Sequence, residues 1–499
     1  MKLGGNLLKQ VDIFFIFCII LRRLLTGRDS DAGQVAAAID ILTEDALIEI
    51  FDLCLDYGDG HNSWHTLVHV CRRWRNIVFG SSSYLMLVLL CHPRTPVRQS
   101  LDIWPPLPIT IHDDNGYPTS GLDNVIAALE HNDRVYEVML RDLSISQLQE
   151  VAATLGRPFP ELGYLELHTD ESEVPNLPHP LLGGSAPRLE ELRLSGIPFM
   201  GLPSLLSSTR SLESLHLCYI PHLSPNIVLS YLSALTSLEE LRIEFPFQCC
   251  LRCLLTTRRP RRRRRIFLPV LRRFSLAGSS RYVEDLAAWI NAPLLEHLVI
   301  NLADERVLDT PQLVRLINRT RMFKAPIEAR VLFEVSAGRV ILPSSKRIIG
   351  TEAVTVNIGC EVLFGQHFCL TQICSSLPSL SMVENLYISD DGERPPHWQD
   401  NIENARWWDL LRPFTAVKNL YLSKVFAPRI APALRELFLE STTDVLPELQ
   451  NIFLEDFQPS ESAETTIWQF VSTRHVNGHP IVVAHWDREL DTWKEYDGW

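Results

Sequence analysis

Two histidines could serve as metal ligands on one face of a helix. His65 and His69 are four residues apart, the spacing at which two zinc ligands meet on consecutive helical turns. Thr66 stands where a metalloprotease helix carries its glutamate. We therefore expect both histidines to flank a packed helix face, and we expect no metal site.

One cysteine pair also has metal-ligand spacing. Cys250 and Cys253 form a CxxC beside Cys249, but no second pair and no pair of histidines follows at zinc spacing. The eleven cysteines are scattered from Cys18 to Cys374, an odd number in a long chain. They are typical of reduced thiols, which places the protein in the cytoplasm, the nucleus or both.

Sequence patterns of enzymes are absent. The chain has no Walker loop, no dinucleotide-binding glycine fingerprint and no nucleophile elbow. Gly183-Gly184-Ser185 is followed by Ala-Pro, which is typical of a loop. Acidic residues fall at positions expected to be solvated. We expect no catalytic residue and no cofactor.

The sharpest charge feature is a run of arginines, Arg258–Arg265, within a predicted loop at 248–267. Consecutive arginines repel one another, so a solvated loop is the simplest interpretation, and nuclear import or nucleic-acid contact is the alternative. The whole chain has 47 basic and 60 acidic residues, a net charge of −13. This balance argues against nucleic acid or an anionic membrane as its general partner.

The first 40 residues contain a short apolar stretch, Ile13–Leu21, followed by Arg22 and Arg23. Nine residues are too few to span a bilayer, which takes about 20. Arginines stand where a signal peptide needs its small-residue cleavage site. We expect residues 1–40 to be a poorly ordered extension, with an interfacial anchor or a secretory signal as alternatives.

Helical periodicity begins at Leu42–Gly80. Thr43 is a plausible N-cap, and apolar residues recur at helical spacing in two segments. About 40 residues cannot bury a large core alone, so we expect this segment to be completed by the rest of the chain or by a partner. The two apolar faces are Leu47, Ile50, Phe51, Cys54 and Leu55, and then Leu67, Val70, Cys71, Trp74, Ile77 and Val78.

This segment resembles an F-box, a family with a Leu-Pro-x-Glu-x-Leu-x-x-Ile-Phe pattern and a later Leu-x-x-Val-Cys-x-x-Trp-Arg pattern. Thr43 departs from the pattern, where the family has proline. A plain helical hairpin is the alternative. The resemblance implies binding to a Skp-type adaptor, and through it to a cullin, by Leu42, Thr43, Leu47, Ile50, Phe51, Leu67, Val70, Cys71 and Trp74.

The rest of the chain repeats an apolar-x-x-apolar-x-apolar pattern. The first five copies start 27, 27, 23 and 26 residues apart, within the period of leucine-rich repeats. Helical faces, such as the one after Thr310-Pro311, lie between copies. Copies start at Val135, Leu162, Leu189, Leu212, Leu238, Leu271, Leu295, Val383, Val417, Leu434 and Leu449.

We therefore predict an α/β fold in which a helical F-box precedes a leucine-rich-repeat-like solenoid. The alternative is an ordinary parallel α/β sheet without a fixed period. Between Leu295 and Val383 the sequence is rich in strand-forming residues but lacks the leucine-rich-repeat pattern. The predicted parts are the F-box at 42–80, a connector at 81–134, the solenoid at 135–456 and a C-terminal cap at 457–499.

The stretch from Leu42 to His485 resembles basidiomycete-type fungal F-box proteins with leucine-rich-repeat-like tails. The phrases that carry this resemblance include TLVHVCRRWRNIVF, INAPLLEHLVI and WWDLLRPFTAVKNLYLS. It implies a substrate receptor of a Skp–cullin–F-box ubiquitin ligase, acting in ubiquitin-dependent degradation of an unidentified target protein. A repeat scaffold acting without any ligase, and an F-box protein acting with its adaptor alone, are the rivals.

Each predicted strand places one outward side chain between two inward leucines. The last four of these outward residues are aromatic, and interfaces favour aromatic and Arg side chains. A target protein is expected on this face, and the alternative is that the cap or a loop of the chain covers the rings. The candidate target-binding residues are Arg193, His216, Arg242, Tyr387, Tyr421, Phe438 and Phe453.

Overall fold

A computed structural model describes most of the chain from Leu42 to Arg488, in two compact units, Met1–Leu189 and Glu190–Trp499. We describe each unit by itself. The described residues are 42–57, 67–68, 70–80, 87–91, 97–103, 106–112, 121–171, 181–198, 202–220, 223–245, 265–302, 310–343, 352–360, 363–390, 402–439, 445–455, 461–476 and 480–488.

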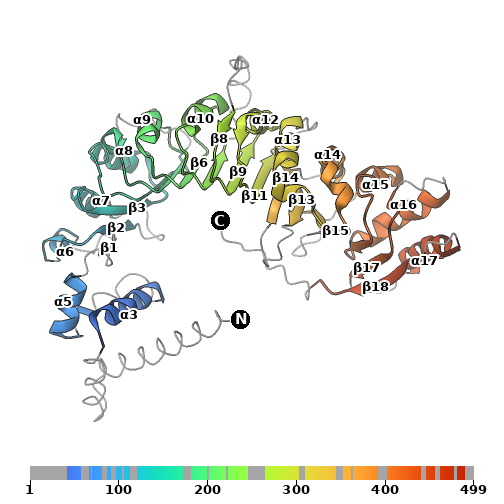
Figure 1. The fold of residues 1–499 in the computed structure, drawn as a ribbon, viewed down its shortest axis with the longest axis horizontal. Helices are drawn as coiled ribbons and strands as arrows, with labels where there is room; N and C mark the ends of the chain where they lie inside the picture. The colour runs from blue at the N-terminus through green and yellow to red at the C-terminus, as the bar shows by residue number, and fades with distance from the viewer. Residues whose placement is uncertain are drawn as a thin grey trace, which may run out of the picture. The chain divides into compact units, whose positions relative to one another are not determined.

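The first unit begins with helices and continues as alternating strands and helices (Figure 1). Its strands pair in parallel in the order β1-β2-β3-β4. In chain order the elements are α3 (Glu44–Tyr57), α5 (Arg72–Gly80), β1 (Leu87–Leu90), α6 (Val97–Ile103), β2 (Ile109–His112), α7 (Leu122–Leu129), β3 (Val135–Leu140), α8 (Ile145–Thr154), β4 (Tyr164–His168) and η1 (Leu181–Gly184).

The second unit repeats the strand–helix alternation. Its elements up to the middle of the unit are β5 (Glu191–Ser195), α9 (Leu202–Ser208), β6 (Ser214–Cys218), α10 (Pro225–Leu232), β7 (Glu240–Glu244), β8 (Ile266–Phe267), β9 (Arg273–Gly278), α12 (Ser280–Trp289), β10 (Ile290–Asn291), β11 (His297–Leu302), α13 (Pro311–Arg319) and η3 (Arg321–Phe323). The small strands β8 and β10 pair with each other outside the main sheet.

The remaining elements complete a sheet of strand order β5-β6-β7-β9-β11-β14-β13-β12-β15-β16-β17-β18 in this unit. They are β12 (Glu328–Phe333), β13 (Ala337–Pro343), β14 (Glu352–Gly359), α14 (Leu363–Ser376), η4 (Pro378–Met382), β15 (Asn385–Asp390), α15 (Asn404–Leu411), β16 (Asn419–Leu422), α16 (Ala427–Leu439), β17 (Asn451–Glu455), α17 (Glu461–Val476) and β18 (Val482–Trp486).

Alternation along each strand separates a buried face from an open face. In β5, Leu192 and Leu194 are buried while Arg193 between them is partly exposed. The leucines face the helices, which in Figure 1 lie along one side of the strands of this unit. We call the other side of the sheet the open face. The fold is thus mixed α/β with a long, largely parallel sheet, as the repeat predicted.

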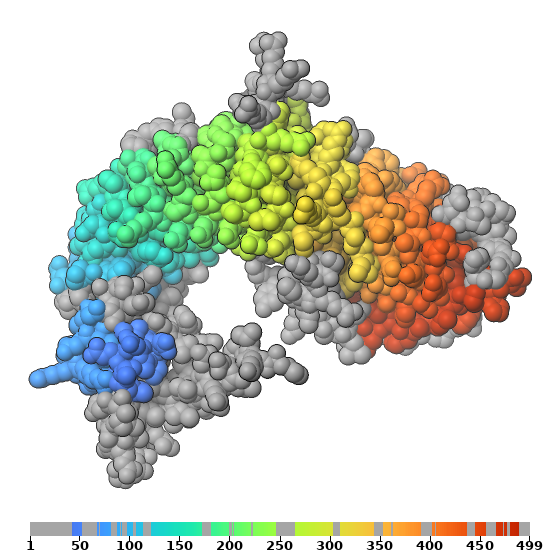
Figure 2. Space-filling model, viewed as in Figure 1, coloured from blue at the N-terminus to red at the C-terminus, as the bar shows by residue number. Residues whose placement is uncertain are grey.

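The region without the leucine signature is built differently from the repeats. β12, which follows α13 in the chain, does not pair with β11. Two strands lie between them in the sheet: β13 pairs antiparallel with β12, and β14 pairs antiparallel with β13. β14 then pairs with β11, and β12 pairs with β15, both in parallel. β13 therefore lies antiparallel between β12 and β14 in the sheet, and Figure 2 shows the yellow-to-orange surface here as continuous.

A column of asparagines supports the strands at the other end of the unit. Asn385, Asn419 and Asn451 begin β15, β16 and β17 in register. The Asn419 amide donates to Asn385 Oδ1 at 2.7 Å, and the Asn451 amide donates to Asn419 Oδ1 at 2.7 Å. Each side-chain amide thereby donates a hydrogen bond to the side-chain oxygen of the asparagine on the neighbouring strand, where the strands start.

One predicted strand is wrong. The copy starting at Leu434 lies within helix α16, so Phe438 is a helical residue and not an outward strand residue. Phe426, Ile430 and Leu434 are fully buried at intervals of four, which is the period of a helix face and not of a strand. β16 accordingly pairs directly with β17.

The sheet also extends beyond its predicted bounds of 135–456. β1 and β2 lie in the predicted connector, and β1 pairs in parallel with β2 and β2 with β3, although their sequences lack the repeat pattern. β18 lies in the predicted cap and pairs with β17. Helix α17 also lies in the predicted cap, buries Ile467, Phe470 and Val471, and ends at Val476.

Candidate functional site

The helical module Glu44–Gly80 forms its own small core. The rings of Phe51 and Trp74 lie 4.9 Å apart, tilted by 60°, and both side chains are about 1% exposed. Leu47 and Leu67 are equally buried. These four residues, predicted to bind an adaptor, are buried in the core of the module. Their role as direct adaptor contacts stays a prediction.

The other predicted adaptor residues are accessible. Leu42, Ile50 and Val70 are partly exposed, and Thr43 and Cys71 are exposed. The Ala46 amide donates to Thr43 Oγ1 at 3.3 Å, so Thr43 caps α3 as predicted. The Trp74 amide donates to Cys71 Sγ at 3.4 Å, so Cys71 begins α5 in the same manner. This accessible set is where a partner can touch the module.

On the open face of the second unit, the outward strand residues align in one row, which we call the central row. Register pairs Arg193 with His216 and His216 with Arg242. At the other end of the sheet, Tyr387 is paired with Tyr421 and Tyr421 with Phe453. The complete row is Arg193, His216, Arg242, Ser275, Val299, Thr355, Ile341, Arg330, Tyr387, Tyr421, Phe453 and Ala484.

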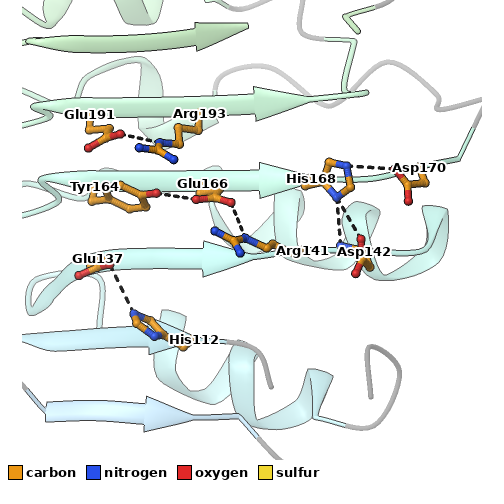
Figure 3. Close-up of polar contacts among 10 residues, drawn as sticks. All are labelled: His112, Glu137, Arg141, Asp142, Tyr164, Glu166, His168, Asp170, Glu191 and Arg193. Carbon is orange, nitrogen blue, oxygen red and sulfur yellow. Dashed lines mark hydrogen bonds and ion pairs between the residues drawn. The ribbon is translucent and has the colours of Figure 1, made fainter. Parts of the chain in front are cut away.

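The first half of the central row consists of charge pairs. Arg193 Nε contacts Glu191 at 2.5 Å (Figure 3), and Arg242 contacts Glu244 at 2.6 Å. His216 Nε2 lies 3.1 Å from Glu240, although His216 is only 6% exposed. These pairs hold the arginine side chains in place while leaving them partly exposed. This half of the row therefore presents ordered charges of both signs.

Glu240 is the most strongly paired carboxylate of this half. It also contacts Arg273 at 2.6 Å. Burial alone raises the pKa of Glu240, but hydrogen bonds from His216 and Arg273, with the charge of Arg273, lower the pKa to about 2. Glu240 thus stays ionised at all physiological pH values and acts as a fixed anion.

The second half of the row is an aromatic ladder, Tyr387–Tyr421–Phe453. The first two rings stack with centroids 4.1 Å apart and the last two with centroids 4.5 Å apart, in nearly parallel planes. The Arg330 guanidinium lies 4.6 Å above the Tyr387 ring and extends the stack. Trp486 of β18 contacts Tyr387 and Tyr421, and Tyr387 is only 8% exposed. Thus a residue of the predicted cap covers these rings.

Sequence patterns missed Arg330 and Trp486. Arg330 lies in β12, which has no leucine signature, so its place in the row depends on the antiparallel detour. Trp486 ends a strand that was predicted as part of the cap. The signal available for β12 was the alternation of Arg330 with buried Ala329 and Val331.

The first unit carries a similar chain of polar contacts along its strands (Figure 3). His112 Nε2 lies 3.4 Å from Glu137. Glu166 accepts hydrogen bonds from the Tyr164 hydroxyl and from Arg141 Nε, each at 2.5 Å. These contacts join adjacent strands and leave Glu166 8% exposed, which indicates a structural role.

One group in the described part of the chain has the composition of a metal site. His168 places Nδ1 3.1 Å from Asp142 and Nε2 3.0 Å from Asp170 (Figure 3). One potential ligand atom from each residue lies within 4.8 Å of the others. Both ring nitrogens already contact a carboxylate, and both aspartates are exposed, so the geometry is that of a surface ion-pair cluster.

Two cysteine thiols have raised pKa values, whereas a nucleophilic thiol has a lowered one. Burial, with the nearby Glu244 charge, raises the pKa of Cys218 to about 12, and burial raises the pKa of Cys374 to about 12. Both remain protonated at neutral pH, and a thiolate is the reactive form.

Several predicted features lie outside the described residues: the apolar stretch Ile13–Leu21, the pair His65 and His69, the cysteines at 249, 250 and 253, and the arginine run up to Arg264. Among the helices that the structure describes, none combines the length and apolar character needed to cross a bilayer.

Comparisons with known proteins found little. No family model matches the chain, and no curated protein matches it. One solved structure that matches is the leucine-rich repeat-containing protein LegL7 from Legionella pneumophila. The match has 13% identity, a TM-score of 0.27, and covers 77% of this chain and 97% of that chain.

Proposed function

We propose that this chain is a protein-binding scaffold that acts as an F-box substrate receptor. The F-box segment 42–80 would bind a Skp-type adaptor and, through it, a cullin. The open face of the second unit would hold a target protein. Catalysis would come from other subunits, which act by proximity. Such a receptor works in the cytoplasm or the nucleus.

The observation that carries the protein-binding part is the central row. Its side chains from Arg193 to Phe453 are positioned by strand register and by partners within the sheet. Ordered arginines and aromatic rings are the side chains that contribute most at protein interfaces, because little entropy is lost when they bind. A long sheet face of this kind fits an extended protein surface rather than a small molecule.

The adaptor-binding part is supported by the resemblance to the F-box pattern and by what the module leaves accessible. Ile50 and Val70 are apolar and partly exposed, although their neighbours Phe51 and Trp74 complete a core. Apolar side chains on short helices are suited to a partner's groove. The same closed core favours the alternative, a repeat scaffold that acts without a ligase, because the module does not need a partner to bury Phe51 and Trp74.

A binding measurement with a purified fungal Skp-type adaptor separates these functions. Replacing Ile50 by Asp places a charge at the proposed contact, and the expected loss is about 2 kcal/mol, or about 30-fold in Kd. The matched control is Glu49→Gln, an exposed change on the same helix. Isothermal titration calorimetry gives both values.

The proposal expects the unaltered chain and the Glu49→Gln variant to bind the adaptor equally. Thermal melts should be the same for all three proteins, because Ile50 is outside the core. If the unaltered chain failed to bind any Skp-type adaptor while remaining folded, the scaffold alternative would replace the receptor.

A further inference from the structure

The last described residues of the chain lie across the aromatic ladder. We call Trp486–Arg488 the strap. The Trp486 ring lies 5.7 Å from both the Tyr387 and the Tyr421 ring, at 61° and 71° to them. These are edge-to-face contacts, which aromatic rings prefer. Trp486 is 6% exposed, so its ring is packed rather than resting on the surface.

The other end of the strap reaches an acidic pair. Arg488 lies 3.9 Å from an Asp390 carboxylate oxygen and 3.8 Å from a Glu455 carboxylate oxygen, and it also donates to the Asp390 carbonyl. The Asp390 side chain is 4% exposed and accepts a hydrogen bond of 2.7 Å from Ser423 Oγ. Asp390 ends β15 and Glu455 ends β17, so both lie at the same edge of the ladder.

A buried carboxylate is costly without a cation. Asp390 therefore needs a positive charge at the place that Arg488 occupies. The ladder needs a cover in the same way, because stacked rings are unfavourable when they face water. The surface thus specifies two features of whatever lies on it: an aromatic ring and, two residues further, an arginine.

The strap leaves the sheet at its edge strand. β18 pairs with β17 on one side and is the last strand in the sheet order of this unit. The strap begins at the last paired residue, and Asp487 is exposed. Its release exposes the ladder without breaking the pairings among β15, β16 and β17. The ladder forms the second half of the central row, so the strap covers one end of the proposed target-binding face.

We propose that this surface binds a segment of the target protein with an aromatic residue followed two positions later by arginine, and that the strap occupies the site until such a segment replaces it. This deepens the target-binding half of the proposed function and rests on it. The strap is an internal copy of the ligand, and its own sequence, His-Trp-Asp-Arg, supplies the probe.

The test uses the full-length chain with Trp486→Ala and Arg488→Ala, and a fluorescein-labelled peptide of residues 484–490, AHWDREL. Fluorescence anisotropy should show saturable binding to this opened variant. The unaltered chain should bind about tenfold more weakly, because its strap is bound most of the time. Peptides with alanine for the tryptophan or glutamate for the arginine should not bind.

Two further changes in the opened variant locate the site. Asp390→Asn should abolish peptide binding. Asp409→Asn, an exposed change on helix α15, is the matched control and should leave it intact. A thermal melt establishes that each variant is folded. If the double variant does not fold, Arg488→Glu replaces it, since this change releases the ionic end and keeps Trp486.

Failure of the peptide to bind any folded, opened variant would overturn the proposal. Equal binding to the Asp390→Asn variant would overturn it as well. A strap-dependent dimer of the unaltered chain, seen by size-exclusion chromatography with light scattering, would assign the site to a second copy and also overturn it. The assay contains no adaptor, so its outcome is independent of whether the F-box module binds one.

Discussion

At the scale of single residues, a buried histidine makes the protein sensitive to acid. His367 in α14 packs edge-on against Trp407, with ring centres 4.8 Å apart, and is 2% exposed. Burial, with the charge of Arg406, lowers the pKa of His367 from 6.5 to about 4. The folded protein therefore holds this ring neutral where the unfolded chain would protonate it.

This difference predicts a loss of stability as pH falls. Because the folded pKa lies below the unfolded one, the stabilisation is complete above pH 6.5 and is lost progressively toward pH 4. The loss from this residue between pH 7 and pH 5 is about 2 kcal/mol. Urea unfolding at a series of pH values measures it. The His367→Phe variant should lose less stability over that range, and an unchanged pH dependence in this variant would contradict the assignment.

A second prediction concerns Tyr387 in the aromatic ladder. Tyr387 stacks on Tyr421, lies beneath Arg330 and is covered by Trp486. Replacing it by alanine should lower the free energy of unfolding by about 3 kcal/mol, through lost burial and lost ring contacts. Phe453→Ala at the more exposed end of the ladder should cost less. Equal and small losses in chemical denaturation would show that the ladder is not packed.

Single residues of the central row were predictable because the repeat fixes the period. Arg193, His216 and Arg242 follow directly from alternation between buried leucines. Alternation along one strand does not predict which residues a distant segment of the chain adds to the row. Arg330 enters the row through an antiparallel detour, and Trp486 covers the ladder from the end of the chain. Neither contact has a signature in local sequence.

At the scale of elements, neighbouring repeats are joined by a shared helix cap. Thr310 precedes Pro311 at the N-cap position of α13, but its side chain makes no capping hydrogen bond. Instead Glu284 of α12 accepts hydrogen bonds from the backbone amides of Gln312 and Leu313, at 2.8–2.9 Å. A carboxylate at a helix N-terminus satisfies free amides and favours the helix dipole.

This cap can be tested in hydrogen exchange. Glu284→Ala should destabilise α13 by about 1–2 kcal/mol, seen as faster exchange of amides 312–319. Glu284→Gln keeps an accepting oxygen and loses the charge, so its effect should lie between those of alanine and glutamate. Identical exchange in all three proteins would show that Thr310 or solvent caps the helix.

Element types were predicted best where several signals agreed. The helices after Ser224 and after Thr310 have proline at their first position and a clear apolar face. The copy at Leu434 shows the limit, because six residues of LRELFL fit both a strand and a helix. The buried side chains of Phe426 and Ile430 favour the helix, because they extend the buried face of Leu434 over three turns.

At the scale of the whole molecule, the account assigns one task to each unit. The helical module belongs to the first unit, and the central row lies in the second. The repeat predicted the mixed α/β fold and the long parallel sheet, since its period alone determines both. The two ends of the sheet were not predicted, because β1, β2 and β18 pair through backbone hydrogen bonds that need no leucine pattern.

The central claim is that one chain binds an adaptor and a target through separate surfaces. Affinity purification with mass spectrometry tests it with three folded forms: the unaltered chain, Ile50→Asp, and Arg193→Glu with Arg242→Glu. The account predicts that Ile50→Asp loses adaptor and cullin peptides and keeps the target. The open-face variant should lose the target and keep the adaptor, because reversed charges repel the paired surface. Loss of both partner sets in either variant, or no adaptor with the unaltered chain, would contradict the account.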